Sequence, residues 1–530
     1  MKRVLDRAPA LWTHGIHLKE GSIHKKQVQL HSGKQSMNRI EFLKTLGFGA
    51  VAVGAGQSLL TGCMNHDMAE MSAVAPTIQE GAFTTPLPLM KTVASGASLK
   101  AGTQTHAIVP GKPASVLGYN DSMLGPVFRV ERGVPVTIPF TNSLTEETNI
   151  HWHGLVVPAS MDGHPDQLVK SGQSFTYTFT LDQPAGMAWY HPHPHMKTGK
   201  QVYMGLAGLF IVDSPEERAL KLPSGDLELP LVIQDKRLDA SGTPVYNPSM
   251  PEVMVGYMGD TLVVNGVNAP FHPVATRTYR LRLLNGSNGR IYNLALSNGE
   301  AFHVIGSDGG LLPAPERVSS LLLAPGERVD LLVDFSKAAL NSEVFLQSSA
   351  FSGVSSQGSQ TFKLVKFMVN RSEADPFKMP ASFPALATLS PASATKTRKL
   401  TIGDAMHGAG GHSNKKPMAG MHTINGKTYD AARIDESVAL NSTEIWEFDN
   451  SMGDEPHPMH LHGTLFQVVG RSGGRGSLMA HEKGWKDTVL VMPKETVRVI
   501  VRFQRTGKFV FHCHNLEHED DGMMLNYEVK

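Results

Sequence analysis

The sequence predicts an all-β protein made of three β-sandwich domains in tandem. After residue 83, short alternating segments are separated by Gly, Pro, Asn and Asp, and similar patterns recur at the scale of whole domains. Helical periodicity is scarce in the same part of the chain. The chain has 530 residues, of which 41% are hydrophobic, so it is long enough for three or four domains of ordinary size with substantial cores.

The recurring unit is an alternating strand that runs into an Asn-centred turn and then a second strand. It occurs as "FRVERGVPVTIPFTNSL", "RTYRLRLLNGSNGRIYNLAL" and "STEIWEFDNSMGDEPHPMHLHG". A second similarity links "LLLAPGERVDLLVDF" in the middle of the chain with "VLVMPKETVRVIVRF" near its end. We therefore expect domains at 84–215, 225–370 and 397–530, with the proline-rich stretch "MPASFPALATLSP" as the connector between the last two.

The first 63 residues are expected to form an N-terminal extension and an export signal of the lipoprotein type. Met37–Cys63 joins a short basic start to a Gly/Ala/Leu/Val run and ends in "LTGC", which resembles a bacterial lipobox. "RIEFLK" also resembles a twin-arginine export signal, but Ile40 stands where the second arginine belongs. Residues 64–83 are expected to be a tether. We therefore expect an exported bacterial protein, either periplasmic or anchored to the outer membrane through a lipid on Cys63.

The charge balance excludes one class of partner. The chain has 49 Lys+Arg against 48 Asp+Glu, so there is no electrostatic basis for binding nucleic acid. We expect a monomer whose partners are small molecules.

Four His-x-His pairs carry the chemistry. They are His151/His153 in "HWHG", His191/His193 in "WYHPHPH", His460/His462 in "HPMHLHG" and His512/His514 in "HCH". In a strand, residues i and i+2 face the same side, so each pair can hold neighbouring metal ions with its two imidazoles. Two pairs lie in the first repeat, two in the last and none in the middle one, which places the chemistry between the first and third domains.

Cys513 stands between two of these histidines and faces the opposite side of the same predicted strand. His518 and Met523 follow it, and His457 precedes "HLH" without belonging to a pair. Two histidines, one thiolate and a weak axial methionine are the ligand set of a blue-copper centre. Met524 is an alternative axial ligand, but the spacing favours Met523. Cys513 would then connect this centre to the histidine side of the strand through a few covalent bonds.

These motifs resemble those of the multicopper oxidases, a laccase-like family of three cupredoxin domains with Greek-key β-sandwich folds, over about 84–530. The resemblance implies four copper ions. His457, Cys513, His518 and Met523 would hold the type 1 ion, and His151 and His460 the type 2 ion. The type 3 pair would be held by His153, His191, His193, His462, His512 and His514. "HPHPH" also offers the register His193/His195, but the flanking residues favour 191/193.

The activity that the resemblance implies is one-electron oxidation of a reductant at the type 1 copper, coupled to four-electron reduction of dioxygen to water at the other three ions. Because this reduction consumes protons, we expect carboxylates near the cluster. Asp162 in "MDGHP" and Glu519, which follows His518, match the family's acidic residues. Asp520 and Asp521 are interpreted as surface charges.

The reductant remains open between two classes. "WYHPHPHMKTGKQVYMGLAGLFIV", "GWKDTV" and "HNLEHEDDGMM" look most like the exported bacterial branch that oxidises Cu(I) and confers copper tolerance. The segment 404–422 holds several Met and His residues and is either a short Cu(I)-collecting loop or a glycine-rich loop with incidental methionines. Without such a loop, a general laccase acting on phenols and aromatic amines is the alternative. A third alternative is a non-catalytic copper-binding or structural relative, which the complete ligand set argues against.

Overall fold

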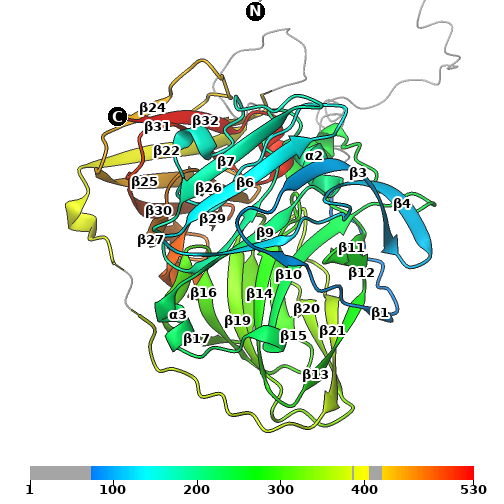
Figure 1. Ribbon diagram of the computed structural model, residues 1–530. Helices are drawn as coiled ribbons and strands as arrows, with labels where there is room; N and C mark the ends of the chain where they lie inside the picture. The colour runs from blue at the N-terminus through cyan, green and yellow to red at the C-terminus, as the bar shows by residue number, and fades with distance from the viewer. Residues whose placement is uncertain (1–72, 385–386, 405–419) are drawn as a thin grey trace, which may run out of the picture. The chain divides into compact units, whose positions relative to one another are not determined.

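The computed structural model describes residues 73–384, 387–404 and 420–530, and strands dominate these residues. The strands form six sheets, which pair into three sandwiches (Figure 1). The signal expected at Met37–Cys63 and most of the segment 404–422 lie outside the described residues. Among those described, no helix is both long enough and apolar enough to cross a bilayer.

The first sandwich joins two four-stranded sheets. The strand order in one is β4 (Lys112–Tyr119), β3 (Leu99–Val109), β6 (Pro135–Asn142) and β7 (Ser174–Thr180). In the other it is β2 (Thr92–Val93), β5 (Val127–Glu131), β9 (Gly208–Asp213) and β8 (Gly186–Tyr190). Their alternating residues enclose one core, in which Leu99 and Ile138 of the first sheet meet Phe128 and Phe210 of the second.

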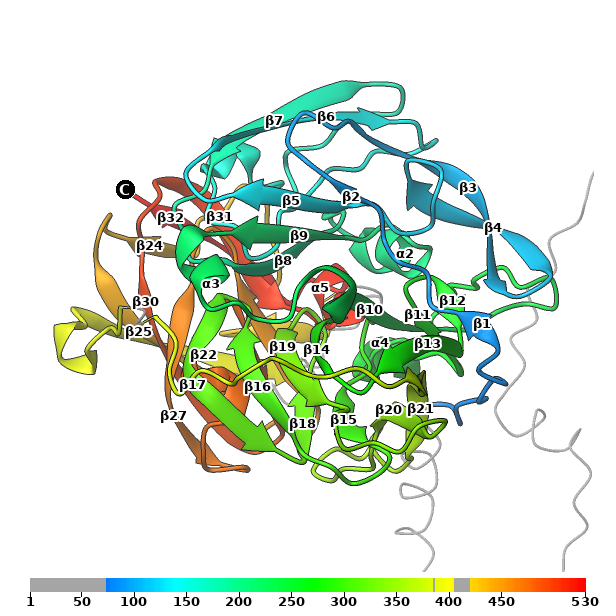
Figure 2. The same cartoon turned by 60° about the horizontal axis from the view of Figure 1, so that its bottom comes forward.

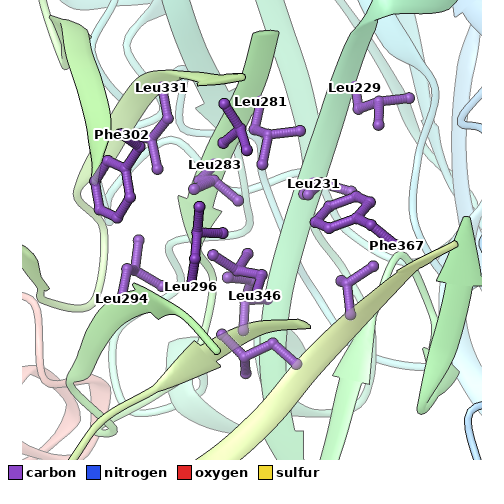
Figure 3. Close-up of a cluster of buried hydrophobic side chains, with 14 of the residues drawn as sticks. Leu229, Leu231, Leu281, Leu283, Leu294, Leu296, Phe302, Leu331, Leu346 and Phe367 are labelled. Carbon is purple, nitrogen blue, oxygen red and sulfur yellow. The ribbon is translucent and has the colours of Figure 1, made fainter. Parts of the chain in front are cut away.

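The second sandwich has larger sheets. One is ordered β12 (Val267–Asn268), β11 (Thr261–Val264), β10 (Glu228–Lys236), β14 (Thr278–Asn285), β19 (Arg328–Asp334), β16 (Phe302–Ser307) and β17 (Gly310–Val318). The other is ordered β1 (Thr85–Pro86), β13 (Pro270–Ala275), β21 (Phe362–Arg371), β20 (Glu343–Ser348), β15 (Tyr292–Leu296) and β18 (Ser320–Leu323). Figure 3 shows Leu281 and Leu331 of the first sheet in the core that also holds Leu294, Leu346 and Phe367 of the second.

The third sandwich carries most of the predicted metal ligands. One sheet is ordered β23 (His422–Ile424), β22 (Lys396–Asp404), β25 (Thr443–Asn450), β30 (Glu495–Arg502), β27 (Phe466–Gly473) and β28 (Trp485–Lys486). The other is ordered β24 (Glu436–Val438), β32 (Met524–Val529), β31 (Gly507–Cys513), β26 (His457–Leu461) and β29 (Thr488–Val491). Cys513 and Met523 belong to the core between these sheets.

Four short α-helices are described: α2 (Thr198–Tyr203), α3 (Pro215–Ala219), α4 (Met250–Val255) and α5 (Leu516–Asp520). Single turns of 3-10 helix occur at η1 (Ala159–Met161), η2 (Gly225–Leu227), η3 (Pro391–Ser393) and η4 (Ala480–Lys483). α5 contacts both α2 and α4, as can be followed in Figure 2. This places the segment after Cys513 against helices contributed by the other two sandwiches.

The repeat that the sequence predicts extends to irregular details of the sheets. β16 of the second sandwich shifts register between Val304 and Gly306, and β27 of the third shifts between Val468 and Gly470. Each strand pairs with the strand of the "PGER" or "PKET" segment, β19 or β30. An equivalent bulge at an equivalent place gives a residue-by-residue correspondence between the two domains.

The start of the described chain differs from a free tether. Ile78 and Phe83 are buried, and Ile78 belongs to the core of the second sandwich. The amide of Ala75 donates to the carbonyl of Ser356, and β1 adds a parallel strand to β13. Residues 73–86 therefore pack along the second sandwich before the chain enters the first, because their apolar side chains find a place at its edge. The limits 84–215, 225–370 and 397–530 stay predictions.

Candidate metal centre

The Cys513 centre, which we define as His457, Cys513 and His518, brings three donor atoms together. The Sγ atom of Cys513 lies 3.5 Å from Nδ1 of His457 and 3.6 Å from Nδ1 of His518, and the two Nδ1 atoms are 3.2 Å apart. His457 begins β26, Cys513 ends β31 and His518 lies on α5, so two strands and one helical turn converge. All three side chains are buried. This triangle of one sulfur and two nitrogens is suited to one soft metal ion.

Met523 lies directly before β32, next to Cys513. The amide of Cys513 donates to the carbonyl of Met523 at 3.0 Å, and Met523 is fully buried in the same core as Cys513. Met524 is also fully buried and pairs with His512 across the strands β31 and β32. Met523 therefore shares the layer of Cys513, whereas Met524 shares that of His512.

The eight-histidine cluster lies on the other side of β31. Its members are the four predicted pairs: His151, His153, His191, His193, His460, His462, His512 and His514. His151 forms a β-bridge with His191, and His460 faces His512 across β26 and β31. Nε2 of His151 lies 3.3 Å from Nε2 of His460, so the His151–His191 bridge of the first sandwich faces the strand pair β26 and β31 of the third.

Three Nε2 atoms illustrate how tightly the cluster converges. Nε2 of His512 lies 3.1 Å from Nε2 of His193 and 3.1 Å from Nε2 of His462. The ring of His514 lies 4.9 Å from that of His153 and 5.3 Å from that of His191. His195, the alternative register, stands outside and packs against Tyr429 at 4.8 Å between ring centroids.

Hydrogen bonds on the outer ring nitrogens orient the imidazoles. Nδ1 of His151 donates to the Asp162 carbonyl at 2.8 Å, and Nδ1 of His460 donates to the Asp487 carbonyl at 2.9 Å. Nδ1 of His512 likewise donates to the Cys513 carbonyl at 3.0 Å. Because the proton then sits on Nδ1, the Nε2 lone pair of each ring faces inward, as metal coordination requires.

Burial keeps the imidazoles neutral. Loss of solvation lowers the pKa of His191 to about 3 and that of His457 to about 3. It also lowers the pKa of His153 and His514 well below the usual value, with neighbouring histidines adding to the effect. Neutral imidazole is the form that binds metals, so the cluster is ready to coordinate at neutral pH.

Asp162 and Glu519 both reach the cluster, but in different ways. Asp162 is fully buried, its Oδ2 accepts from Nδ1 of His462 at 2.7 Å, and burial raises its pKa well above the usual value. Glu519 lies between two imidazoles, 3.4 Å from Nδ1 of His193 and 3.2 Å from Nδ1 of His512. Each carboxylate therefore contacts the outer edge of predicted ligands, where it can orient them.

Sequence reasoning missed Asp487 and Thr488 of "GWKDTV". Oδ1 of Asp487 accepts from Nε2 of His153 at 2.9 Å, and Thr488 Oγ1 lies 3.1 Å from the same nitrogen. Asp487 is fully buried, and charges and hydrogen bonds from Arg328 and His153 hold its pKa well below the usual value despite burial. The sequence did offer one indication of this role: Asp487 is an acidic residue directly before the apolar strand β29, which pairs with β26.

Asp520 and Asp521 are not surface charges, which corrects the interpretation from sequence. Oδ2 of Asp520 accepts from the amide of Gly199 at 2.8 Å, and Oδ1 accepts from the amide of Thr198 at 3.1 Å. Oδ2 of Asp521 accepts from the amide of Met421 at 2.8 Å and lies 3.1 Å from Nδ1 of His422. Both carboxylates join α5 to distant segments because unpaired backbone N–H groups approach them there.

The donor set fits copper. Several buried imidazole nitrogens have no hydrogen-bond partner among the described residues: Nδ1 of His153, Nε2 of His191 and both nitrogens of His514. Burying a polar atom without a partner is energetically costly, so these nitrogens are suited to binding metal ions. Imidazole suits copper, zinc, iron or nickel, whereas the His₂Cys triangle with a methionine beside it is typical of copper.

The comparisons with known proteins agree with this chemistry. Three sequence profiles described as multicopper oxidase match residues 101–217, 236–363 and 401–530. The chain is 36% identical over 422 residues to a multicopper oxidase (mco) of Staphylococcus haemolyticus, covering 78% of this chain and 84% of the relative. It is 35% identical over 425 residues to a cell division protein FtsP of Xenorhabdus nematophila, covering 77% and 84%.

A solved structure supports the same family. McoA, a multicopper oxidase from Aquifex aeolicus, superimposes with a TM-score of 0.77 at 36% identity and covers 86% of this chain and 100% of its own. The profiles, the relatives and the fold all point in one direction. The chain therefore belongs to the multicopper oxidase family, and its sandwiches are cupredoxin-like.

Proposed function

We propose that the protein oxidises Cu(I) with dioxygen: four Cu(I), one dioxygen and four protons become four Cu(II) and two waters. In this proposal His457, Cys513, His518 and Met523 hold type 1 copper, His151 and His460 hold type 2 copper, and the other six histidines hold the type 3 pair. Resident copper at these sites would supply one-electron redox chemistry and a place for dioxygen. The protein's own residues orient these ligands, exclude water and pass electrons between the sites.

One observation carries the proposal: Cys513 and its neighbours face opposite sides of one strand. The Sγ atom of Cys513 meets His457 and His518, whereas Nε2 of His512 meets His193 and His462. An electron received at the sulfur is therefore only a few covalent bonds from either histidine neighbour. Burial raises the pKa of Cys513, so the metal-free thiol stays protonated. The thiolate that binds copper would therefore form only when the metal binds.

The surroundings of the Cys513 centre favour a small cation as the reductant. Nε2 of His518 donates to the carbonyl of Met254 on α4 at 3.0 Å, and His422 stacks on the same ring at 3.8 Å between centroids. His518 is therefore covered on its edge and on one face. His457, in contrast, borders a small cleft, so electrons are expected to arrive at His457.

This cleft is small and acidic. Its volume is about 50 Å³, and its lining includes Met254, His422, Asp454 and Glu455. About 10–15 Å³ of such space holds one water, so the cleft has room for a metal ion with a few water molecules. Burial raises the pKa of Glu455 to about 7, and its Oε2 accepts from Ser356 Oγ at 2.7 Å. A thioether and an imidazole are ligands that suit Cu(I), and the neighbouring carboxylates attract a cation.

The test compares oxygen uptake by copper-loaded protein with Cu(I) and with a phenol under air, corrected for uptake without protein. The proposal expects uptake with Cu(I) to exceed uptake with the phenol. Glu455→Gln should lower the Cu(I) rate and leave the phenol rate unchanged. The expected loss is about fivefold, because about 1 kcal/mol of attraction from this half-buried carboxylate corresponds to that factor. Asp182→Asn is the control, because Asp182 is 77% exposed, pairs with Arg505 at 3.0 Å and does not line the cleft. A phenol rate above the Cu(I) rate would make the protein a general laccase.

A second candidate follows from the relative named as a cell division protein. A non-catalytic member of the family would hold copper or a partner without consuming dioxygen. Blue colour together with no oxygen uptake from any reductant would favour this candidate.

The proposed setting is outside the bacterial cytoplasm. It rests on the signal-like segment ending at Cys63, which lies outside the described residues. Mass spectrometry of the protein from membranes, expected to find a lipid on Cys63 as the first residue, tests the anchor. Size-exclusion chromatography with light scattering tests the expected monomer.

A further inference from the structure

We propose that Arg328 of the second sandwich positions Asp487, and through it His153 and His460, so that the domain without metal ligands sets the geometry of the eight-histidine cluster. This rests on the proposed role of those histidines as copper ligands. Arg328 is a positioning residue here, since it touches none of the ligands' donor atoms.

The guanidinium of Arg328 joins all three sandwiches. Nε donates to the carbonyl of Met187 in the first sandwich at 3.1 Å. Nη1 donates to the carbonyl of Gly326 at 2.9 Å and to Oδ1 of Asp487 at 2.8 Å. Nη2 donates to the carbonyl of Asp308 at 3.2 Å and to Oδ2 of Asp487. All five N–H donors are used, so the planar group is fixed in position and orientation.

Asp487 transmits this orientation to the cluster. Its Oδ1 accepts hydrogen bonds from Nη1 of Arg328 at 2.8 Å and from Nε2 of His153 at 2.9 Å. Its main-chain carbonyl receives Nδ1 of His460 at 2.9 Å. One residue thus holds one imidazole from the first sandwich and one from the third. A rotation of its carboxylate would turn the ring of His153 directly.

Asp308 fixes the main chain of the same segment. Its Oδ2 lies 3.3 Å from the amides of Asp487 and Thr488 and 2.9 Å from Nζ of the buried Lys486. Its Oδ1 accepts from the amide of Arg328 at 2.8 Å. Asp308 of the second sandwich therefore binds both the side chain of Lys486 and the backbone amides of Asp487 and Thr488.

Close packing leaves this arrangement no free space. Gly154, which follows His153, has φ +87°, and a Cβ there would lie 2.4 Å from Nη2 of Arg328 and 2.6 Å from Oδ2 of Asp487. Gly326 has φ +82°, and a Cβ there would lie 2.9 Å from Cγ of His514. The glycines of "HWHG" and "APGER" thus let the second sandwich approach two of the histidine pairs.

The repeat shows that these residues are specific to the second sandwich. The equivalent register shifts align Asp308 with Ser472 and Arg328 with Thr496, which themselves pair across β27 and β30. The third sandwich thus has small hydroxyl residues where the second has a buried aspartate and arginine. The sandwich fold itself does not require the charges of Asp308 and Arg328, and a buried ion pair is weak evidence for a role in stability. Their contacts with Asp487 explain why charged residues stand at these two positions.

The test uses the copper-loaded full chain with Arg328→Lys, which keeps the charge but not the planar fork. The matched control is Arg280→Lys: Arg280 is also buried in the second sandwich and pairs with Glu217 at 2.7 Å and with Asp330, away from the cluster. We expect Arg328→Lys to keep the blue absorption of the Cys513 centre. Its type 2 copper signal in electron paramagnetic resonance should shift, and oxygen uptake or copper retention should fall about 10–100-fold. Arg280→Lys should leave the type 2 signal unchanged.

An Arg328→Lys protein with the parent's type 2 signal and copper content would overturn the role of Arg328, even if its thermal stability fell as in Arg280→Lys. If Arg328→Lys does not fold, Asp308→Asn decides by the same signal, and an unshifted signal overturns the proposal. A parent protein that loads copper but shows no type 2 signal would instead overturn the proposed function, and the assignment of Arg328 with it.

Discussion

Replacing Asp162 with alanine should weaken the eight-histidine cluster by a predictable amount. Oδ2 of Asp162 accepts from Nδ1 of His462 at 2.7 Å, and both side chains are fully buried. Leaving the buried Nδ1–H of His462 without its acceptor costs about 1–3 kcal/mol. Each 1.4 kcal/mol is a factor of ten, so losing this support should lower copper retention or oxygen uptake about 5–150-fold.

The assay measures copper per chain after dialysis against a chelator, and oxygen uptake at saturating reductant. Asp162→Asn should lose less than Asp162→Ala, because the amide oxygen can still accept from His462. Asp182→Ala is the control, since Asp182 is 77% exposed and pairs only with Arg505 among the described residues. Parent-like retention and uptake in Asp162→Ala would refute the reasoning. An asparagine variant as impaired as the alanine variant would show that the charge or proton matters rather than the hydrogen bond.

Two further predictions concern stability. Gly326→Ala should lower the free energy of unfolding by about 1–3 kcal/mol, because its φ of +82° strains an alanine. It should also disturb the type 3 absorption, because the new Cβ would press on the ring of His514. In the control Gly299→Ala, φ is +76° but the Cβ enters open space, so only the backbone strain should remain. Burial lowers the pKa of His164 from 6.5 to about 4, although Asn526 and Asp166 raise it and Lys508 adds to the lowering. The unfolded chain therefore takes up the proton first, so stability should fall by about 3 kcal/mol between pH 6.5 and pH 4. Urea unfolding at several pH values should show a smaller pH dependence in His164→Gln, and an unchanged dependence would contradict the assignment.

The sequence was sufficient for features that follow from local periodicity. Alternation along strands predicted an all-β chain, and the i, i+2 rule placed His512 and His514 on the side opposite Cys513. The internal repeat predicted related sandwiches, and the structure adds a bulge that β16 and β27 share. These features depend on residues close together in the chain, so a single sequence contains them.

Features that depend on tertiary approach were missed. Arg328 and Asp487 are 159 residues apart, and only the meeting of the second and third sandwiches makes them a pair. Asp520 looked like part of an exposed acidic run, but α2 brings the amides of Thr198 and Gly199 to it. In both cases the partner belongs to another sandwich, and no local pattern announces it.

The proposed function requires Cys513 to join a single-copper centre to the eight-histidine cluster. The most direct measurement records absorption, electron paramagnetic resonance and oxygen uptake of the copper-loaded parent and of Cys513→Ser. We expect Cys513→Ser to lose the blue colour and oxygen uptake while the type 2 signal of the cluster persists. A serine variant that stays blue, or that consumes oxygen at the parent's rate, would contradict it.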